Sequence, residues 1–262
     1  MLKKLVLIIL VLLCLLSVAG GKLYWDKRLQ QVAHASSLDA SETASAAALA
    51  NDVSNLKIIR QIHRLPKEMQ PAALAAYKKN GQVQIAMIGD RQVQVYAQLL
   101  QNSFDATFGQ FFFKVTPLSL NQTTSLQLNQ LQPGNLLQSM PAKPDAVFYV
   151  PLIYNDDHQV STDDTKAVML ALKDKLAKAD PKAPFYVVLP NGSTKLAYMS
   201  ARISGVAQYA EAQKLTVLDG FAKLPTGKQL GNLLEADGVT LNQAGRTVWA
   251  DNIDQLLGLM KP

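Results

Sequence analysis

The sequence predicts an α/β fold: a three-layer sandwich with a mainly parallel five-stranded sheet, preceded by an N-terminal membrane segment and a helical stalk. From residue 83 onward, short apolar runs alternate with stretches whose apolar residues recur at every third or fourth position. This alternation is typical of parallel sheets whose strands are connected by helices on both faces. Upstream the composition changes twice, so we expect a membrane segment at 1–25, helices at 26–80 and the α/β domain at 81–262.

The N-terminal segment is expected to be a signal-anchor. Two lysines precede residues 5–21, which carry no charge, and the aromatic pair Tyr24-Trp25 follows, as suits a membrane interface. The rest of the chain would then lie outside the cytoplasmic membrane. Ser17-Val18-Ala19 also resembles a cleavage site, which leaves a secretory signal peptide and a secreted protein as the alternative.

Residues 26–80 are predicted to form a stalk and two helices. The region is rich in alanine and serine, and the apolar spacing favours a helix over 44–63 that ends before Pro66. A shorter helix is expected to follow and to close at Gly81. No residue type in this region points to catalysis.

The predicted domain contains five strands and four long helices. Apolar runs place the strands at 83–89, 111–118, 145–154, 184–190 and 215–219. Helical spacing begins at Val93 and recurs at 161–180, 196–213 and 241–260. The third strand (DAVFYVPLIY) is apolar almost throughout, which is typical of a strand buried on both faces. In the last helix, Trp249 is expected to face inward.

Composition excludes several classes of function. The 26 basic and 20 acidic residues are dispersed, so the net charge of +6 does not indicate nucleic-acid binding, although it would suit lipid head groups or polyanionic polymers. Cys14 is the single cysteine, so a disulfide within the chain and a cysteine-ligated metal are excluded. The acidic pair Asp156-Asp157 matches no calcium-loop spacing. No cofactor and no metal are expected.

Ligands of parallel α/β sheets bind beyond the carboxyl ends of the strands. The residues at these positions are Asp90-Arg91, 118–121, Asn155-Asp156, 191–193 and the loop before the last helix. The short motifs Gly89-Asp90 and Asn155-Asp156, together with DGVTLNQAG over 237–245, resemble the SGNH, or GDSL-type, hydrolase superfamily across residues 81–260. The resemblance implies a flavodoxin-like fold and an esterase, lipase, carbohydrate deacetylase or acyltransferase activity.

The resemblance also implies where the catalytic residues should be, and two of them differ. Arg91 stands where the superfamily has its nucleophilic serine, and Thr240 stands where it has its histidine base, three residues after the aspartate Asp237. Of the oxyanion-hole positions, Asn155 matches the asparagine, and Asn121 lies nearest the glycine. Because neither arginine nor threonine can act as a base near neutral pH, the usual mechanism is not possible at its usual place.

Two pairs of interpretations stay open. Ser193 and His158 follow neighbouring strands and could form a relocated catalytic pair, or Ser193 could belong to a turn and His158 to a solvated loop. Asp90, Arg91 and Asn155 could bind a carboxylate, phosphate or sugar. Alternatively, Arg91 could pair with Asp90 or Asp237 and fill the space that the superfamily uses as its active site.

The sequence therefore predicts a catalytically impaired SGNH-like protein that binds, or helps to process, a cell-envelope glycan or acylated polymer. The alternatives are an active esterase or acyltransferase with a rearranged site, and a structural partner of a membrane-bound polymer-assembly machine.

Overall fold

The computed structural model describes residues 56–222 and 228–259. The predicted membrane segment, most of the predicted stalk and Cys14 lie outside these residues. Within the described residues, no helix has the length and apolar character needed to cross a membrane. The compact unit that carries the fold begins at Ile58.

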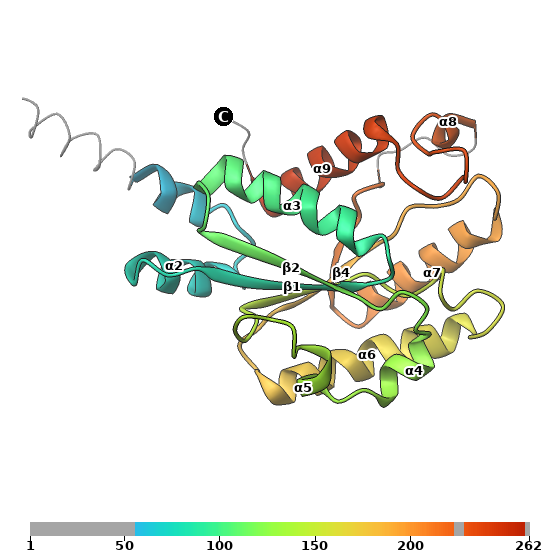
Figure 1. Ribbon diagram of the computed structural model, residues 1–262, viewed down its shortest axis with the longest axis horizontal. Coiled ribbons are helices and arrows are strands. Elements are labelled where there is room, and N and C mark those ends of the chain that lie inside the picture. Colours follow the sequence, from blue (N-terminus) through green and yellow to red (C-terminus); the bar gives the residue numbers. More distant parts are fainter. Residues whose placement is uncertain (1–55, 223–227, 260–262) are drawn as a thin grey trace, which may run out of the picture. The chain divides into compact units, whose positions relative to one another are not determined.

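The centre of the fold is a five-stranded, fully parallel sheet with the order β2-β1-β3-β4-β5 (Figure 1). The strands are β1 (Val83–Gly89), β2 (Phe113–Ser119), β3 (Ala146–Tyr149), β4 (Phe185–Val188) and β5 (Thr216–Leu218). The predicted parallel sheet is thus confirmed. The strand order changes direction at β1, which places the carboxyl end of β1 beside that of β3.

Helices cover both faces of the sheet. In Figure 1, α3 (Val93–Phe108) and α9 (Gln243–Leu257) lie above it, and α4 (Ser125–Gln130), α5 (Pro133–Leu136) and α6 (Thr162–Ala179) lie below it. Buried residues of α7 (Tyr198–Ala212) belong to the same apolar cluster as those of α6, so α7 covers the same face as α6. Residues 56–62 are also helical, and the other helices of the described residues are α2 (Gln70–Lys78) and the short α8 (Lys228–Gly231). Ser161 caps α6, because its side chain accepts a hydrogen bond from the backbone N–H of Asp164 (3.0 Å).

The two faces of β1 bury different side chains. Ile85 and Met87 join the cluster under α3 and α9, whereas Ala86 and Ile88 join the cluster under α6 and α7. This division follows from the two-residue period of a strand. Trp249 is only 1% exposed and stacks on Tyr96, with 4.7 Å between ring centroids, so its predicted inward face is confirmed.

Residues 58–80 pack with the sheet and do not project from it. Ile62, Leu65, Met69 and Ala73 are buried in the same cluster as α3 and α9. The predicted helical region 26–80 therefore contributes to the core of the α/β unit from Ile58 onward.

Two features differ from the sequence prediction. The third strand is shorter than the apolar run 145–154, because Pro151 has no N–H to donate to a neighbouring strand, yet residues 150–153 remain buried. The short helices α4, α5 and α8 were not predicted. Each has six residues or fewer, too short for a helical apolar period to show in the sequence.

Candidate functional site

A cleft of about 730 Å³ lies at the carboxyl ends of β1 and β3. The residues that line it come from the loops after β1, β2 and β3 and from the segment before α9: Asp90, Arg91, Gln92, Asn121, Gln122, Tyr154, Asn155 and Val239. Four of the positions predicted from the sequence, Asp90, Arg91, Asn121 and Asn155, therefore meet in one cleft.

The corner between β1 and α3 is shaped by Asp90. Its buried carboxylate accepts a hydrogen bond from the backbone N–H of Gln92 (2.8 Å), and its carbonyl accepts one from the N–H of Val93 (3.1 Å). Burial raises the pKa of Asp90 above its ordinary value, and the hydrogen bond from Gln92 and the charge of Arg91 partly oppose that rise. Asp90 thus begins the turn that presents Arg91.

Arg91 lies in the cleft with an exposed side chain. Among the described residues, no carboxylate lies within 4.0 Å of its guanidinium group, although Arg91 interacts electrostatically with Asp90 and Asp237. The side chain is thus exposed on the wall of the cleft.

Asp237 and Thr240 are joined where the superfamily would place its aspartate and histidine. The Thr240 hydroxyl donates to the Asp237 carboxylate (2.6 Å), and the backbone N–H groups of Val239 and Thr240 donate to its other oxygen (2.9 and 2.8 Å). These hydrogen bonds, led by that of the Thr240 side chain, lower the pKa of Asp237 to about 2. The carboxylate is therefore ionised and held within its own turn.

The two asparagines of the predicted oxyanion hole differ in their hydrogen bonds. The Asn155 amide donates to the carbonyl of Thr123 (2.9 Å), which ties the loop after β3 to the loop after β2. Asn121 is exposed, has a positive φ of 34°, and its side-chain oxygen accepts a hydrogen bond from Ser119 (3.1 Å). The side-chain amide of Asn121 therefore faces solvent at the cleft.

A buried asparagine that sequence reasoning did not single out connects the elements that surround the cleft. Asn191 is fully buried; its side-chain oxygen accepts from the Tyr96 hydroxyl (2.8 Å), and its amide donates to the carbonyl of Val239 (2.7 Å). Its own carbonyl accepts from the Tyr154 hydroxyl (2.8 Å). Asn191 thereby connects α3, the loop after β3 and the segment before α9. Its position just after β4 was the only available signal.

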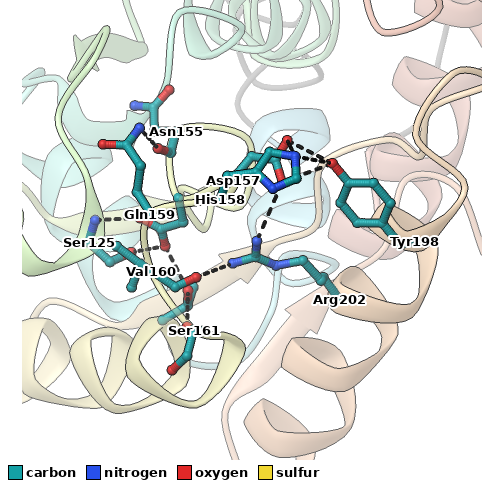
Figure 2. Close-up of polar contacts among 11 residues, drawn as sticks. Ser125, Asn155, Asp157, His158, Gln159, Val160, Ser161, Tyr198 and Arg202 are labelled. Atoms are coloured by element: carbon teal, nitrogen blue, oxygen red, sulfur yellow. Dashed lines mark hydrogen bonds and ion pairs between the residues drawn. The ribbon is translucent and has the colours of Figure 1, made fainter.

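Ser193 and His158 are not brought together by any contact among the described residues. Ser193 is buried, and its hydroxyl oxygen accepts from the backbone N–H groups of Lys195 and Leu196 (both 3.1 Å), as in a turn. His158 lies on the surface beside Asp157 and Tyr198 (Figure 2), with 3.3 Å between its Nε2 and the Tyr198 hydroxyl. Neither residue lines the cleft.

Asp156, the neighbour of Asn155, is a structural residue. Its buried carboxylate accepts from the N–H of Ser125 (2.7 Å), from the Ser125 hydroxyl (2.6 Å) and from the Thr165 hydroxyl (2.6 Å). These bonds join the loop after β3 to α4 and α6. In the part of the chain that the structure describes, no three histidine, aspartate or glutamate side chains gather in a way that could hold a metal ion.

Comparison with known proteins identifies the fold. No protein-family model matches the sequence, and no curated protein matches it significantly. Among solved structures, a GDSL-like lipase from Bacteroides thetaiotaomicron has a TM-score of 0.50 and 16% identity, over 69% of this chain and 89% of that one. A family 3 carbohydrate esterase from Talaromyces cellulolyticus has a TM-score of 0.51 and 16% identity, over 67% and 96%.

A third structure, of a protein described as an SGNH hydrolase from Slackia heliotrinireducens, has a TM-score of 0.50 and 19% identity, over 67% of this chain and 98% of that one. At such identities the similarity concerns the fold, and the chemistry of the cleft must be judged from its own residues. The chain therefore has the fold of these GDSL-like and SGNH hydrolases, as its strand-end motifs predict.

Proposed function

We propose that this chain is a catalytically impaired SGNH-fold protein whose cleft binds a cell-envelope glycan or acylated polymer. The observation that carries the proposal is the combination of an open cleft with Arg91 and Thr240 in place of a nucleophile and a base. A serine hydroxyl reacts only when a nearby base takes its proton, and the residues that line this cleft include neither a serine nor a histidine.

The lining of the cleft suits a ligand rich in hydroxyl groups. Gln92, Asn121, Gln122 and Asn155 contribute side-chain amides, each with a donor and an acceptor. Sugar hydroxyls also donate and accept, so such a lining can match them in pairs. Arg91 adds a forked cationic donor that would recognise a carboxylate or phosphate on the same ligand. The cleft is lined by loop residues and is open to solvent, which favours a segment of a polymer over an enclosed small molecule.

The proposal includes a location. If residues 1–25 anchor the chain as their sequence predicts, the cleft lies outside the cytoplasmic membrane, where glycans and acylated polymers of the envelope are found. The carbohydrate esterase among the similar structures is compatible with a glycan ligand, but this chain lacks the serine and histidine of the superfamily at the usual positions.

The test combines a chemical probe with a binding measurement. The full chain should hydrolyse short acyl esters no faster than a heat-denatured sample and should not react with a fluorophosphonate. Acidic oligosaccharides should bind, and Arg91→Gln should weaken that binding about tenfold or more, as expected for loss of a charge-assisted hydrogen bond. Lys195→Gln, which removes an exposed cation outside the cleft lining, is the matched control.

Two outcomes would contradict the proposal. Stoichiometric fluorophosphonate labelling that Ser193→Ala abolishes would establish an active, rearranged site. Equal binding of acidic oligosaccharides by the chain and its Arg91→Gln variant would show that the cleft is not where they bind.

A further inference from the structure

The edge of the sheet opposite the cleft carries a row of lysines. An exposed lysine lies at or just before the start of each strand: Lys79 before β1, Lys114 in β2, Lys143 before β3, Lys182 before β4 and Lys214 before β5. Because all five strands are parallel and neighbouring strands lie about 4.8 Å apart, this row spans about 19 Å along one edge. We call these five lysines the basic edge.

The charge of the basic edge is not neutralised by ion pairs. None of its lysines lies within 4.0 Å of a carboxylate of a described residue. Of the carboxylates at this edge, Asp145 accepts the backbone N–H of Gln84 (2.7 Å) and Asp180 accepts that of Lys182 (3.0 Å). Glu211 is exposed near Lys214. Asp105 near the end of α3 and Glu68, whose charge acts on Tyr186 of β4, add two more acids, but no ammonium group of the five lysines is paired with a carboxylate within 4.0 Å, so these groups can attract anions.

An aromatic side chain projects at the same edge. Phe111, in the turn between α3 and β2, is 79% exposed and has a positive φ of 73°. A bulky residue rarely adopts this left-handed conformation, and it is strained there. The neighbouring phenylalanines, Phe108, Phe112 and Phe113, contact one another and are at least partly buried, so Phe111 alone of this group is held outward.

The position of Phe111 is maintained by contacts on β1. The side-chain amide of Gln82 donates to the Phe111 carbonyl (2.8 Å), and the N–H of Val83 donates to that of Phe112 (2.9 Å). Val83 is level with Phe113 in the sheet, so the backbone of Phe111 lies beside the start of β1. Phe111 is therefore at the same end of the sheet as Lys79 and Lys114.

A separate apolar pocket of about 310 Å³ is formed at the same edge. Its walls include Leu137 and Met140 after α5 and Leu176 and Ala179 at the end of α6, with Lys143 among the lining residues. The pocket thus combines apolar walls with Lys143 of the basic edge and with Asp180.

We propose that the basic edge and Phe111 contact an anionic lipid surface. Lysines near such a surface are attracted by its negative potential, and an exposed aromatic ring can insert among the acyl chains. A soluble polyanion would use the lysines but would give no role to an outward phenylalanine or to an apolar pocket. The proposal uses residues remote from the cleft and does not depend on the proposed glycan function.

The experiment places a fluorescent reporter at the edge of the full chain. In a Trp25→Phe background, Phe111→Trp adds one exposed tryptophan, while Trp249 remains buried and constant. Leu126→Trp, at an exposed site on α4 beyond the other end of the sheet, is the matched control. Each protein is combined with vesicles of brominated phosphatidylcholine, with and without phosphatidylglycerol, because bromine quenches tryptophan that enters the acyl region.

We expect quenching at position 111 with phosphatidylglycerol vesicles, little quenching without the anionic lipid, and little at position 126 with either. Adding Lys79→Gln and Lys114→Gln should lower the ratio of contacting to free molecules about 25-fold, since each lysine near an anionic surface contributes about a fivefold factor. Lys166→Gln with Lys195→Gln removes the same charge elsewhere and should leave quenching at position 111 unchanged.

The proposal fails if positions 111 and 126 are quenched equally, or if quenching at 111 does not depend on phosphatidylglycerol. It also fails if the chain binds soluble polyglutamate through the basic edge while position 111 stays unquenched in anionic vesicles. That result would mean that the lysines bind a soluble anionic polymer and not a lipid surface.

Discussion

At the scale of single residues, Asp90 and Asp237 flank Arg91, yet their pKa values shift in opposite directions. Asp90 is buried, and the loss of water raises its pKa. Asp237 is exposed but accepts three hydrogen bonds from Val239 and Thr240, which lower its pKa to about 2. The contrast shows that burial and hydrogen bonding, not position in the motif, determine each carboxyl group's charge.

Thr240→Val should raise the pKa of Asp237 toward its ordinary value of 3.8, because the strongest hydrogen bond to the charged form is lost. A carboxyl pKa that is lowered by folding stabilises the protein above the pKa of the unfolded chain, and this contribution disappears as the pH falls toward 2. The variant should therefore be less stable than the parent above about pH 4, and the two should converge near pH 2. Carboxyl NMR titration and denaturant unfolding at both pH values measure this; equal pKa values would contradict it.

Trp249→Ala should lower the free energy of unfolding by about 3–5 kcal/mol, the usual cost of removing a large buried ring. Trp249 is 1% exposed, stacks on Tyr96, and leaves no room for a side chain at Gly220, where a Cβ would lie 2.5 Å from the ring. Urea unfolding measures the change. A loss below about 1 kcal/mol would mean that the ring is not packed as described.

Arg91→Ser together with Thr240→His should restore weak ester hydrolysis. Thr240 already donates to Asp237, and an imidazole at this position could make the same bond with one nitrogen and face the cleft with the other. Either substitution alone should do little, since nucleophile and base act as a unit. We expect a rate up to about 100-fold above the parent, the lower end of what a positioned base contributes. A single variant as active as the double one would show that another group acts as the base.

At the scale of secondary-structure elements, the loop after β3 is held by its aspartate and not by its apolar residues alone. Asp156 accepts hydrogen bonds from Ser125 on α4 and Thr165 on α6, so two helices and a loop share one buried carboxylate. This arrangement fixes the neighbouring Asn155 at the cleft.

Asp156→Ala should lower the free energy of unfolding by about 3 kcal/mol or more, because it leaves the buried donors of Ser125 and Thr165 without their acceptor. Asp157→Ala is the control, since its carboxylate lies nearer the surface, where it accepts from Tyr198 (Figure 2). Its effect should be less than half as large. Denaturant unfolding of both variants compares them, and equal losses would contradict a special role for Asp156.

At the scale of the whole molecule, the two edges of the sheet have different characters. The cleft, with its amides and aspartates, lies at the carboxyl ends of the strands. The five lysines of the basic edge and Phe111 lie at the amino ends. A lipid surface at the amino edge would leave the cleft facing away from the membrane, toward the polymers that we propose as its ligands.

The full chain should fractionate with membranes, and external protease should reach the α/β unit in intact cells. The reason is the uncharged run at residues 5–21 after two lysines. Fractionation and protease protection test this prediction. Recovery in the medium of a mature protein that begins at Gly20 would show instead that the segment is a cleaved signal.

The sequence by itself determined the alternation of strands and helices, the buried faces of α3 and α9, and the strand-end motifs that indicate the fold. These features depend on periods of two and 3.6 residues, which are local and therefore visible in one dimension. The positions of Asp90, Arg91, Asn121 and Asn155 in a common cleft also followed, because carboxyl ends of parallel strands must meet at one edge.

Only the tertiary structure decided how those side chains are used. No carboxylate of the described residues lies within 4.0 Å of the guanidinium group of Arg91, Asn155 is bonded to the loop after β2, and no contact joins Ser193 to His158. The supporting roles of Asn191 and Asp156 depend on partners that are 9 to 95 positions away in the chain. A hydrogen bond requires a distance and an angle between such groups, and packing alone determines both.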